Sequence, residues 1–121
     1  MQTLTTLVLG ASPNPDRYSY LATNLLHEKG YDVYPFGIKK GQIGNMNIIN
    51  EWPTAGSIDT VTLYVGPSGQ SEYYNAILDL APRRIIFNPG TENPDLQALA
   101  QEKGIETIDA CTLVMLKTGQ Y

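Results

Sequence analysis

The residues best placed to do chemistry lie between Gly10 and Arg17. Gly10-Ala11-Ser12 follows an apolar run and precedes a helical pattern, so a hydroxyl and small side chains occupy a strand-to-helix turn. Small residues let a ligand approach the backbone, and a helix start attracts anions through free N–H groups and the dipole. Arg17 is a cation near this helix start, where a bound anion would relieve its conflict with the dipole. The segment predicts a phosphate-binding turn; the alternatives are local turn chemistry for Ser12 and a solvated Arg17.

The loop after the second expected strand bears on which phosphate ligand fits. The chain lacks the dinucleotide fingerprint G-x-G-x-x-G, and residues 34–37 hold no carboxylate for the ribose hydroxyls of NAD. Two cations, Lys39 and Lys40, come next. This pattern disfavours NAD and favours a nucleotide with an extra ribose phosphate, which is coenzyme A (CoA) or NADP. A pair of solvated lysines is the alternative interpretation.

Two further small-residue turns follow the third and fourth expected strands. Gly66-Pro67-Ser68-Gly69 would flank an adenine or a pantetheine arm, and Gly90 after Pro89 permits close approach of a ligand to the backbone. Either turn also has an ordinary structural use, since Gly and Pro are common turn residues.

The alternation of strand and helix patterns predicts a three-layer, Rossmann-like α/β fold. Its sheet is expected to be five-stranded and mainly parallel, in the order 3-2-1-4-5, with residues 48–49 as a short strand or a turn. Ligands of such sheets bind beyond the carboxyl ends of the strands. Arg83 and Arg84 enter the fourth strand at the opposite edge, so we exclude them as ligand contacts. The expected strands are 6–9, 31–34, 60–65, 84–87 and 106–108.

The helical segments are expected to pack through apolar faces. For the first helix the expected inward face is Tyr18, Leu21, Ala22, Leu25 and Leu26. For the second helix, which follows the Gly66–Gly69 turn, the expected inward residues are Tyr73 or Tyr74, Ile77, Leu78 and Ala81. The third is expected to begin with Asn93 as N-cap and Pro94 at its first position.

Composition limits the class of protein. The 121 residues suit one domain, spanning 1–121, and the net charge of −4 argues against non-specific nucleic-acid binding. No apolar run is long enough to cross a membrane, and the first residues do not resemble a signal peptide. A single cysteine excludes an internal disulfide. We therefore expect a cytoplasmic protein.

No set of residues predicts catalysis or metal binding. His27, the only histidine, falls off the apolar face of its helix, and Cys111 has no evident activating partner. Scattered carboxylates with one His and one Cys give no metal-ligand spacing. Acid–base catalysis would rest on Asp109 or Glu92, and neither has a partner in the sequence pattern.

An ordered set of short motifs resembles the family of small stand-alone CoA-binding domains. That family is similar to the N-terminal CoA-binding domain of the succinyl-CoA synthetase α subunit. The motifs cover nearly the whole chain; each is weak, but their order is fairly specific. They are Gly10-Ala11-Ser12, Pro15-x-Arg17-x-Ser19, Gly30-Tyr31-x-Val33-x-Pro35, Ile43-Gly44, Asp59, Pro89-Gly90-x-Glu92-Asn93, Gly104-Ile105 and Asp109-x-Cys111.

The resemblance implies a CoA site with stated roles. The turn at Gly10, Ser12 and Arg17 would bind the phosphates, Lys39 or Lys40 would approach the 3′-phosphate, and residues 65–67 would lie along the nucleotide. The chain departs from the family after the second strand, where it reads Pro35-Phe36-Gly37-Ile38. Because Lys39 and Lys40 follow this departure directly, the family pattern does not fix which of the two lysines approaches the 3′-phosphate.

These observations predict a protein that binds CoA or an acyl-CoA, has no catalytic activity and serves a sensing or regulatory role. One alternative is an NADP-dependent enzyme, or a CoA ligase subunit that needs a partner chain. Another is an interaction module with a vestigial site, since fold does not fix function. Eight tyrosines would suit a homodimer or a protein partner, without showing either.

Overall fold

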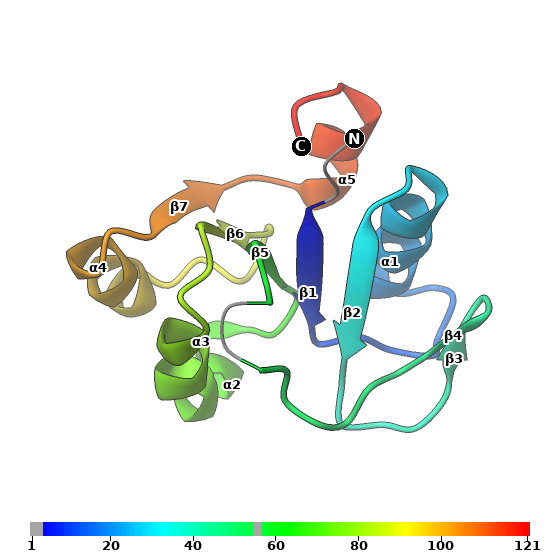
Figure 1. The fold of residues 1–121 in the computed structure, drawn as a ribbon, viewed down its shortest axis with the longest axis horizontal. Coiled ribbons are helices and arrows are strands. Elements are labelled where there is room, and N and C mark those ends of the chain that lie inside the picture. Colours follow the sequence, from blue (N-terminus) through cyan, green and yellow to red (C-terminus); the bar gives the residue numbers. More distant parts are fainter. Residues whose placement is uncertain (1–3, 55–56) are drawn as a thin grey trace.

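Five parallel strands form the central sheet of the structure, a computed structural model that describes residues 4–54 and 57–121. The order across the sheet is β2-β1-β5-β6-β7, and every neighbouring pair is parallel (Figure 1). A separate antiparallel hairpin, β3 (Gln42–Ile43) and β4 (Met46–Asn47), follows β2. The sheet strands are β1 (Thr5–Leu9), β2 (Asp32–Phe36), β5 (Thr60–Leu63), β6 (Arg84–Phe87) and β7 (Glu106–Asp109).

The predicted Rossmann-like α/β fold is confirmed, with one change in how the strands are counted. When the parallel bridge between Phe36 and Ile49 is counted as the third strand, the order becomes 3-2-1-4-5-6, which contains the predicted order 3-2-1-4-5. The prediction gave that place to residues 60–65, but β5 lies between β1 and β6. All four residues of β5 are buried. A strand buried on both faces belongs in the middle of a parallel sheet, whereas the short bridge at Ile49 suits the edge.

Helices cover both faces of the sheet (Figure 1). Leu7 and Leu9 point to a core shared with α3 and α4, whereas Val8 points to a second core shared with α1 and α5. This alternation follows the two-residue period of a strand. The helices are α1 (Tyr18–Glu28), α2 (Pro67–Gln70), α3 (Tyr74–Leu80), α4 (Pro94–Glu102) and α5 (Thr112–Lys117), with a 3-10 turn over Ser71–Tyr73. None of the described helices is long and apolar enough to cross a membrane.

The predicted inward face of α1 is wrong in part. Tyr18 and Leu21 are 72% and 44% exposed, and the buried residues are Ser19, Ala22, Thr23 and Leu26. Thr23 is buried without an unmet hydroxyl because its Oγ1 donates to the Ser19 carbonyl at 2.7 Å. Small side chains on this face let α1 pack close to the sheet.

The prolines and the predicted helix cap lie close to where the sequence pattern placed them, with two changes. Pro35 lies inside β2, although the expected strand ended at residue 34. Its carbonyl accepts from the Ile49 N–H at the outer edge of the sheet, where the missing N–H of a proline is tolerated. The predicted turn at residues 66–69 includes the first turn of α2, with Pro67 near its start. The cap at Asn93 is confirmed, since its side chain accepts from two backbone N–H groups.

The second predicted helix is interrupted. The segment forms α2, a 3-10 turn and α3 in succession rather than one helix. Ile77 and Leu78 are buried as predicted, but Ala81 is exposed. Ala81 ends α3 in the left-handed conformation, with φ of 50°, so it cannot contribute to the inward helical face.

An ion pair at the amino edge of the sheet predicts a pH dependence. Partial burial raises the pKa of Asp59, but hydrogen bonds from Arg83 and Thr60 and the charge of Arg83 outweigh it and lower the pKa. A lowered pKa stabilises the fold above the unfolded pKa, and this contribution disappears as pH falls through the folded value. We expect Asp59→Asn to be less stable than wild type at neutral pH. The difference in urea midpoint should shrink below about pH 4; a difference that persists unchanged into acid would contradict this.

Candidate functional site

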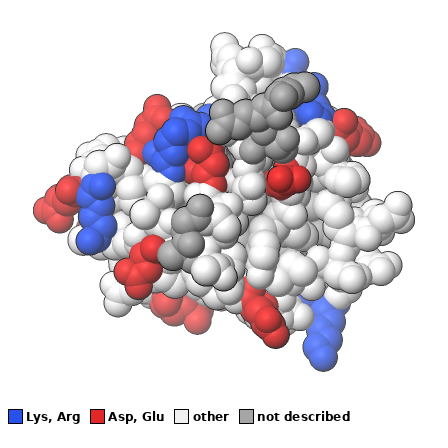
Figure 2. Space-filling model, in the orientation of Figure 1, with Lys and Arg blue, Asp and Glu red and all other residues white. Residues whose placement is uncertain are grey.

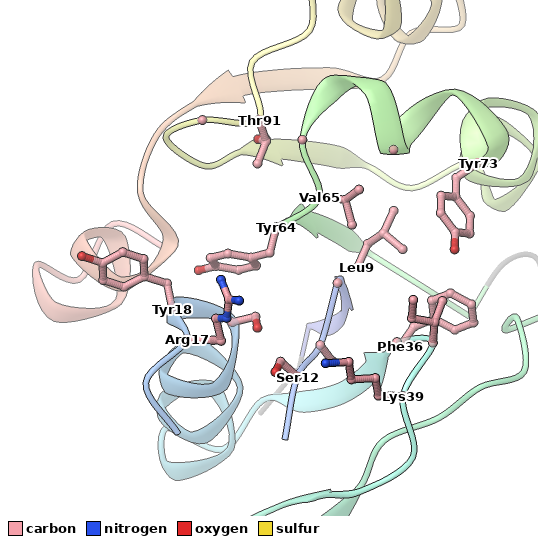
Figure 3. A pocket seen from close by; sticks show the side chains of 18 of the residues that line it. Leu9, Ser12, Arg17, Tyr18, Phe36, Lys39, Tyr64, Val65, Tyr73 and Thr91 are labelled. Carbon is pink, nitrogen blue, oxygen red and sulfur yellow. The ribbon is translucent and has the colours of Figure 1, made fainter. Parts of the chain in front are cut away.

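A cleft of about 620 Å³ opens at the carboxyl edge of the sheet. The elements around it are the β1–α1 turn, the loop after β2, the start of α2 and the loop after β6 (Figure 3). Its size is within the range of small-molecule and cofactor sites. The structure brings nearly all predicted site residues to this cleft: Gly10, Ala11, Ser12, Arg17, Ser19, Lys39, Val65, Gly66, Pro89 and Gly90. Lys40 and Pro67 do not line it.

The Gly10–Ser12 turn lies deep in the cleft with an unusual backbone. Gly10 has φ of +103°, and an added Cβ would lie 2.9 Å from Val65 Cγ2. The N–H groups of Gly10 and Ala11 both donate to the Phe36 carbonyl, which ties the turn to the end of β2. Ser12 Oγ accepts from the Asn14 N–H at 3.1 Å. The hydroxyl therefore serves the turn as an acceptor, and its proton stays available for a ligand.

Arg17 is the N-cap of α1, with extended backbone angles and an exposed side chain. The side chain makes no capping hydrogen bond. The first-turn N–H groups of α1 are thus not capped by Arg17, and its guanidinium lies beside the cleft (Figure 3). A free helix start next to a cation suits an anionic ligand.

Lys39 contributes the second cation of the cleft. It lies on the loop after β2, which is held in place by the Asn50 side chain. Asn50 Nδ2 donates to the Gly37 carbonyl at 2.6 Å and to the Lys39 carbonyl at 3.2 Å. In Figure 3, Lys39 and Arg17 lie apart on the same side of the cleft, with Ser12 between them. Such spacing suits a ligand with more than one phosphate. Of the two lysines, Lys39 lines the cleft, whereas Lys40 is exposed and lies outside the cleft lining.

Aromatic side chains at both ends of the cleft were not predicted as site residues. Phe36 and Tyr73 lie at the Lys39 end, and Tyr18 and Tyr64 lie at the Arg17 end (Figure 3). Trp52 packs behind the first pair, stacked on Tyr73 with ring centroids 5.6 Å apart and edge-on to Phe36. These residues come from segments far apart in the chain, so no local motif marks them.

Tyr64 falls within the expected strand over residues 60–65, but it is not part of β5. It lies just past β5, is half-buried and lines the cleft while packing against the core below α1. Burial raises the pKa of its phenol, and the nearby Cys111 raises it further. The phenol is therefore neutral. Its oxygen is buried, and no hydrogen-bond partner is present among the described residues.

Arg84, which was excluded as a ligand contact, and His27 and Cys111, which were set aside as catalytic groups, do not line the cleft. Arg84 lies at the opposite edge, where its Nε donates to Thr60 Oγ1 at 2.9 Å. His27 is exposed in the last turn of α1, and Cys111 is half-buried as the N-cap of α5. Among the described residues, no group of three or more His, Cys, Asp or Glu residues is placed to bind a metal ion. Basic and acidic side chains are scattered over the face shown in Figure 2.

The fold and the cleft define a Rossmann-like domain with two cationic side chains, Arg17 and Lys39, in a cleft at the carboxyl edge of its sheet. The chain belongs to the CoA-binding domain family, whose model matches residues 4–117. The family resemblance seen in the sequence motifs is thereby confirmed over nearly the whole chain. The likeness to the succinyl-CoA synthetase α subunit stays a prediction.

Several solved structures share this fold. A crystal structure of an uncharacterized protein is 48% identical, with a TM-score of 0.95 and full coverage of both chains. A hypothetical protein from Pyrococcus horikoshii OT3 is 25% identical, with a TM-score of 0.83, covering 93% of this chain and 81% of that one. A structure from Thermus thermophilus is 21% identical, with a TM-score of 0.85 and coverage of 98% and 91%. No curated protein matches the chain.

Proposed function

We propose that this protein binds CoA or an acyl-CoA in the cleft and has no catalytic activity of its own. The observation that carries the proposal is the joint placement of the Gly10–Ser12 turn, Arg17 and Lys39 around one cavity. The family model supports CoA binding in general. Charge-assisted hydrogen bonds and an open helix start supply the affinity for phosphates.

The cleft suggests an orientation for the ligand. The pyrophosphate would lie against the Gly10–Ser12 turn and Arg17, and the 3′-phosphate near Lys39. Phe36 and Tyr73 would then flank the adenosine at the Lys39 end. The pantetheine arm is left with the other end, along Gly90 and Thr91 toward Tyr64 and Tyr18.

The chemistry around the cleft favours binding over catalysis. Glu72 is the carboxylate that lines it, and it is exposed. The buried Tyr64 phenol has a raised pKa, so it is a poor base at neutral pH. The proposed role is therefore to carry or sense the ligand in the cytoplasm, with the signal passed to a second copy of the chain or to a partner protein.

A thermal-shift panel tests the ligand. Free CoA at about 100 times its dissociation constant should add about 2.7 kcal/mol to the stability. Dephospho-CoA should shift the melting temperature less at equal concentration, because it lacks the phosphate assigned to Lys39. NAD and ATP should shift it least. A shift with NADP and none with CoA would reject the proposal and support the NADP-dependent alternative.

A pair of arginine variants tests the site. Arg17→Ala should weaken CoA binding about tenfold, since a charge-assisted contact to phosphate is lost. Arg83→Ala is the matched control, because Arg83 is half-exposed at the opposite edge and pairs with Asp59 and Glu106. It should bind CoA like wild type in the same titration. Equal losses in both variants would place the ligand elsewhere.

A further inference from the structure

Gln70 is a fully buried polar residue that joins two loops of the cleft. It lies at the end of α2 with 0% of its surface exposed. Its Nε2 donates to the Val65 carbonyl and to the Thr91 carbonyl, each at 2.8 Å. Val65 belongs to the loop after β5 and Thr91 to the loop after β6. Both of these residues line the cleft, whereas Gln70 itself does not.

The acceptor side of the same amide is also used. Gln70 Oε1 accepts from Asn93 Nδ2 at 3.0 Å, and that nitrogen also donates to the Tyr74 phenol oxygen at 2.7 Å. The Asn93 side-chain oxygen caps α4. The Gln70 amide thus has a partner for both donor hydrogens and for its oxygen. A fully satisfied buried network specifies one arrangement of the segments that it joins.

If this position only had to be filled, an apolar side chain would avoid the desolvation of a buried amide. With an apolar residue in place of Gln70, however, the Val65 and Thr91 carbonyls would be buried without donors, each with a desolvation penalty. The donors at Gln70 match two carbonyls from the loops that follow the neighbouring strands β5 and β6, which fixes the separation of these two loops. The wall of the cleft opposite Arg17 and Lys39 depends on that separation.

We propose that Gln70 is a positioning residue for the ligand: by bridging the Val65 and Thr91 carbonyls it sets the width of the cleft and hence the affinity for CoA. It acts through the loops and never touches the ligand, because none of its surface is exposed. The inference rests on the proposed function, since CoA is taken as the ligand.

Gln70→Glu separates positioning from packing. Glutamate has nearly the same shape and can accept from Asn93, but an ionised carboxylate cannot donate to either carbonyl. When protonated, it regains one donor. Burial raises the pKa of such a carboxyl. The titratable groups on the surrounding elements are the Tyr74 phenol and the exposed carboxylates of Glu72, Glu92 and Asp95, and the negative charges of these carboxylates raise the pKa of the new glutamate further.

The readout is CoA titration followed by the fluorescence of Trp52, the single tryptophan of the chain. It is a suitable reporter because it packs against Phe36 and Tyr73, which both line the cleft. At about pH 8, Gln70→Glu should bind CoA about tenfold more weakly than wild type at the same pH. The ratio of the two dissociation constants should fall toward unity as the pH is lowered.

Thr60→Val is the matched control. Thr60 is also fully buried and hydrogen-bonded, but it lies at the amino edge of the sheet. This variant should lose stability and keep the dissociation constant for CoA, at every pH. If Gln70→Glu binds like wild type at about pH 8, or if its deficit is independent of pH, the proposal is overturned.

A neutral variant and a ligand-free measurement cover the other outcomes. Gln70→Met has a similar volume and no donors, so it should weaken CoA binding at all pH values; wild-type affinity in a folded Gln70→Met protein overturns the proposal.

In the free protein, amide hydrogen exchange in residues 65–69 and 89–92 should be faster in both Gln70 variants than in wild type. If wild type fails to bind CoA, the proposed function is wrong. The exchange rates then decide the bridging role alone, and unchanged rates reject it.

Discussion

Gly10→Ala is expected to lower the unfolding free energy by about 3 kcal/mol and to remove measurable CoA binding. Gly10 has φ of +103°, a region that residues with a Cβ rarely adopt. The new Cβ would also lie 2.9 Å from Val65 Cγ2 and 3.1 Å from the Tyr64 carbonyl carbon. The backbone contact leaves no flexible side chain to move, so the turn itself must shift. That shift displaces the turn against which the pyrophosphate is proposed to lie.

Two other glycines of the cleft separate backbone strain from steric overlap. Gly90 has φ of +92° but no atom within 4 Å of an added Cβ, so Gly90→Ala should cost only the strain, about 1 to 2 kcal/mol. Gly66 has an ordinary φ of −64° and open space, so Gly66→Ala should leave the stability nearly unchanged. Urea denaturation of the three variants should rank them in this order. A Gly10→Ala protein as stable as Gly66→Ala would show that the turn has no special geometry.

Local signals explain why the turn, the fold class and the α4 cap were predictable from the sequence. A small-residue turn after an apolar strand has one common use in an α/β fold, and its geometry depends on adjacent residues. Asn93 followed by Pro94 specifies a helix start in the same local way. The rule that ligands bind beyond the strand carboxyl ends then brought four separate turns to one cleft.

Features that depend on distant contacts were beyond sequence reasoning. An added Cβ on Gly37 would overlap the Ala11 carbonyl oxygen, so a glycine is needed there because another loop approaches. Nothing near Gly37 in the sequence indicates this contact. The same holds for Gln70, whose hydrogen-bond partners lie on two loops, and for the exposed face of α1, where apolar spacing suggested burial for Tyr18.

Tyr121 closes over the edge of the sheet opposite the cleft. Its phenol is hydrogen-bonded to Thr6, its ring packs edge-on against Tyr31 with centroids 5.0 Å apart, and the Arg84 guanidinium lies 4.4 Å from the ring centroid. Arg84 is 5% exposed, and its Nη2 has no hydrogen-bond partner among the described residues. A buried cation of this kind needs compensation, which the ring supplies in part. Burial raises the pKa of Tyr121, so its phenol stays neutral.

Tyr121→Ala is therefore expected to cost about 3 kcal/mol of unfolding free energy, because it removes the aromatic packing and leaves Arg84 exposed to a cavity. Tyr121→Phe keeps the ring and loses only the hydrogen bond to Thr6, so it should cost about 1 kcal/mol. Urea denaturation measures both values, and a loss in Tyr121→Phe as large as in Tyr121→Ala would show that the ring does not stabilise Arg84.

Because Tyr121 and Arg84 lie at the edge opposite the cleft, both variants should retain the wild-type dissociation constant for CoA under conditions where they are folded. If Tyr121→Ala instead weakened CoA binding, a change at one edge of the sheet would have reached the cleft at the other edge. The contact of α5 with α1 would be the route.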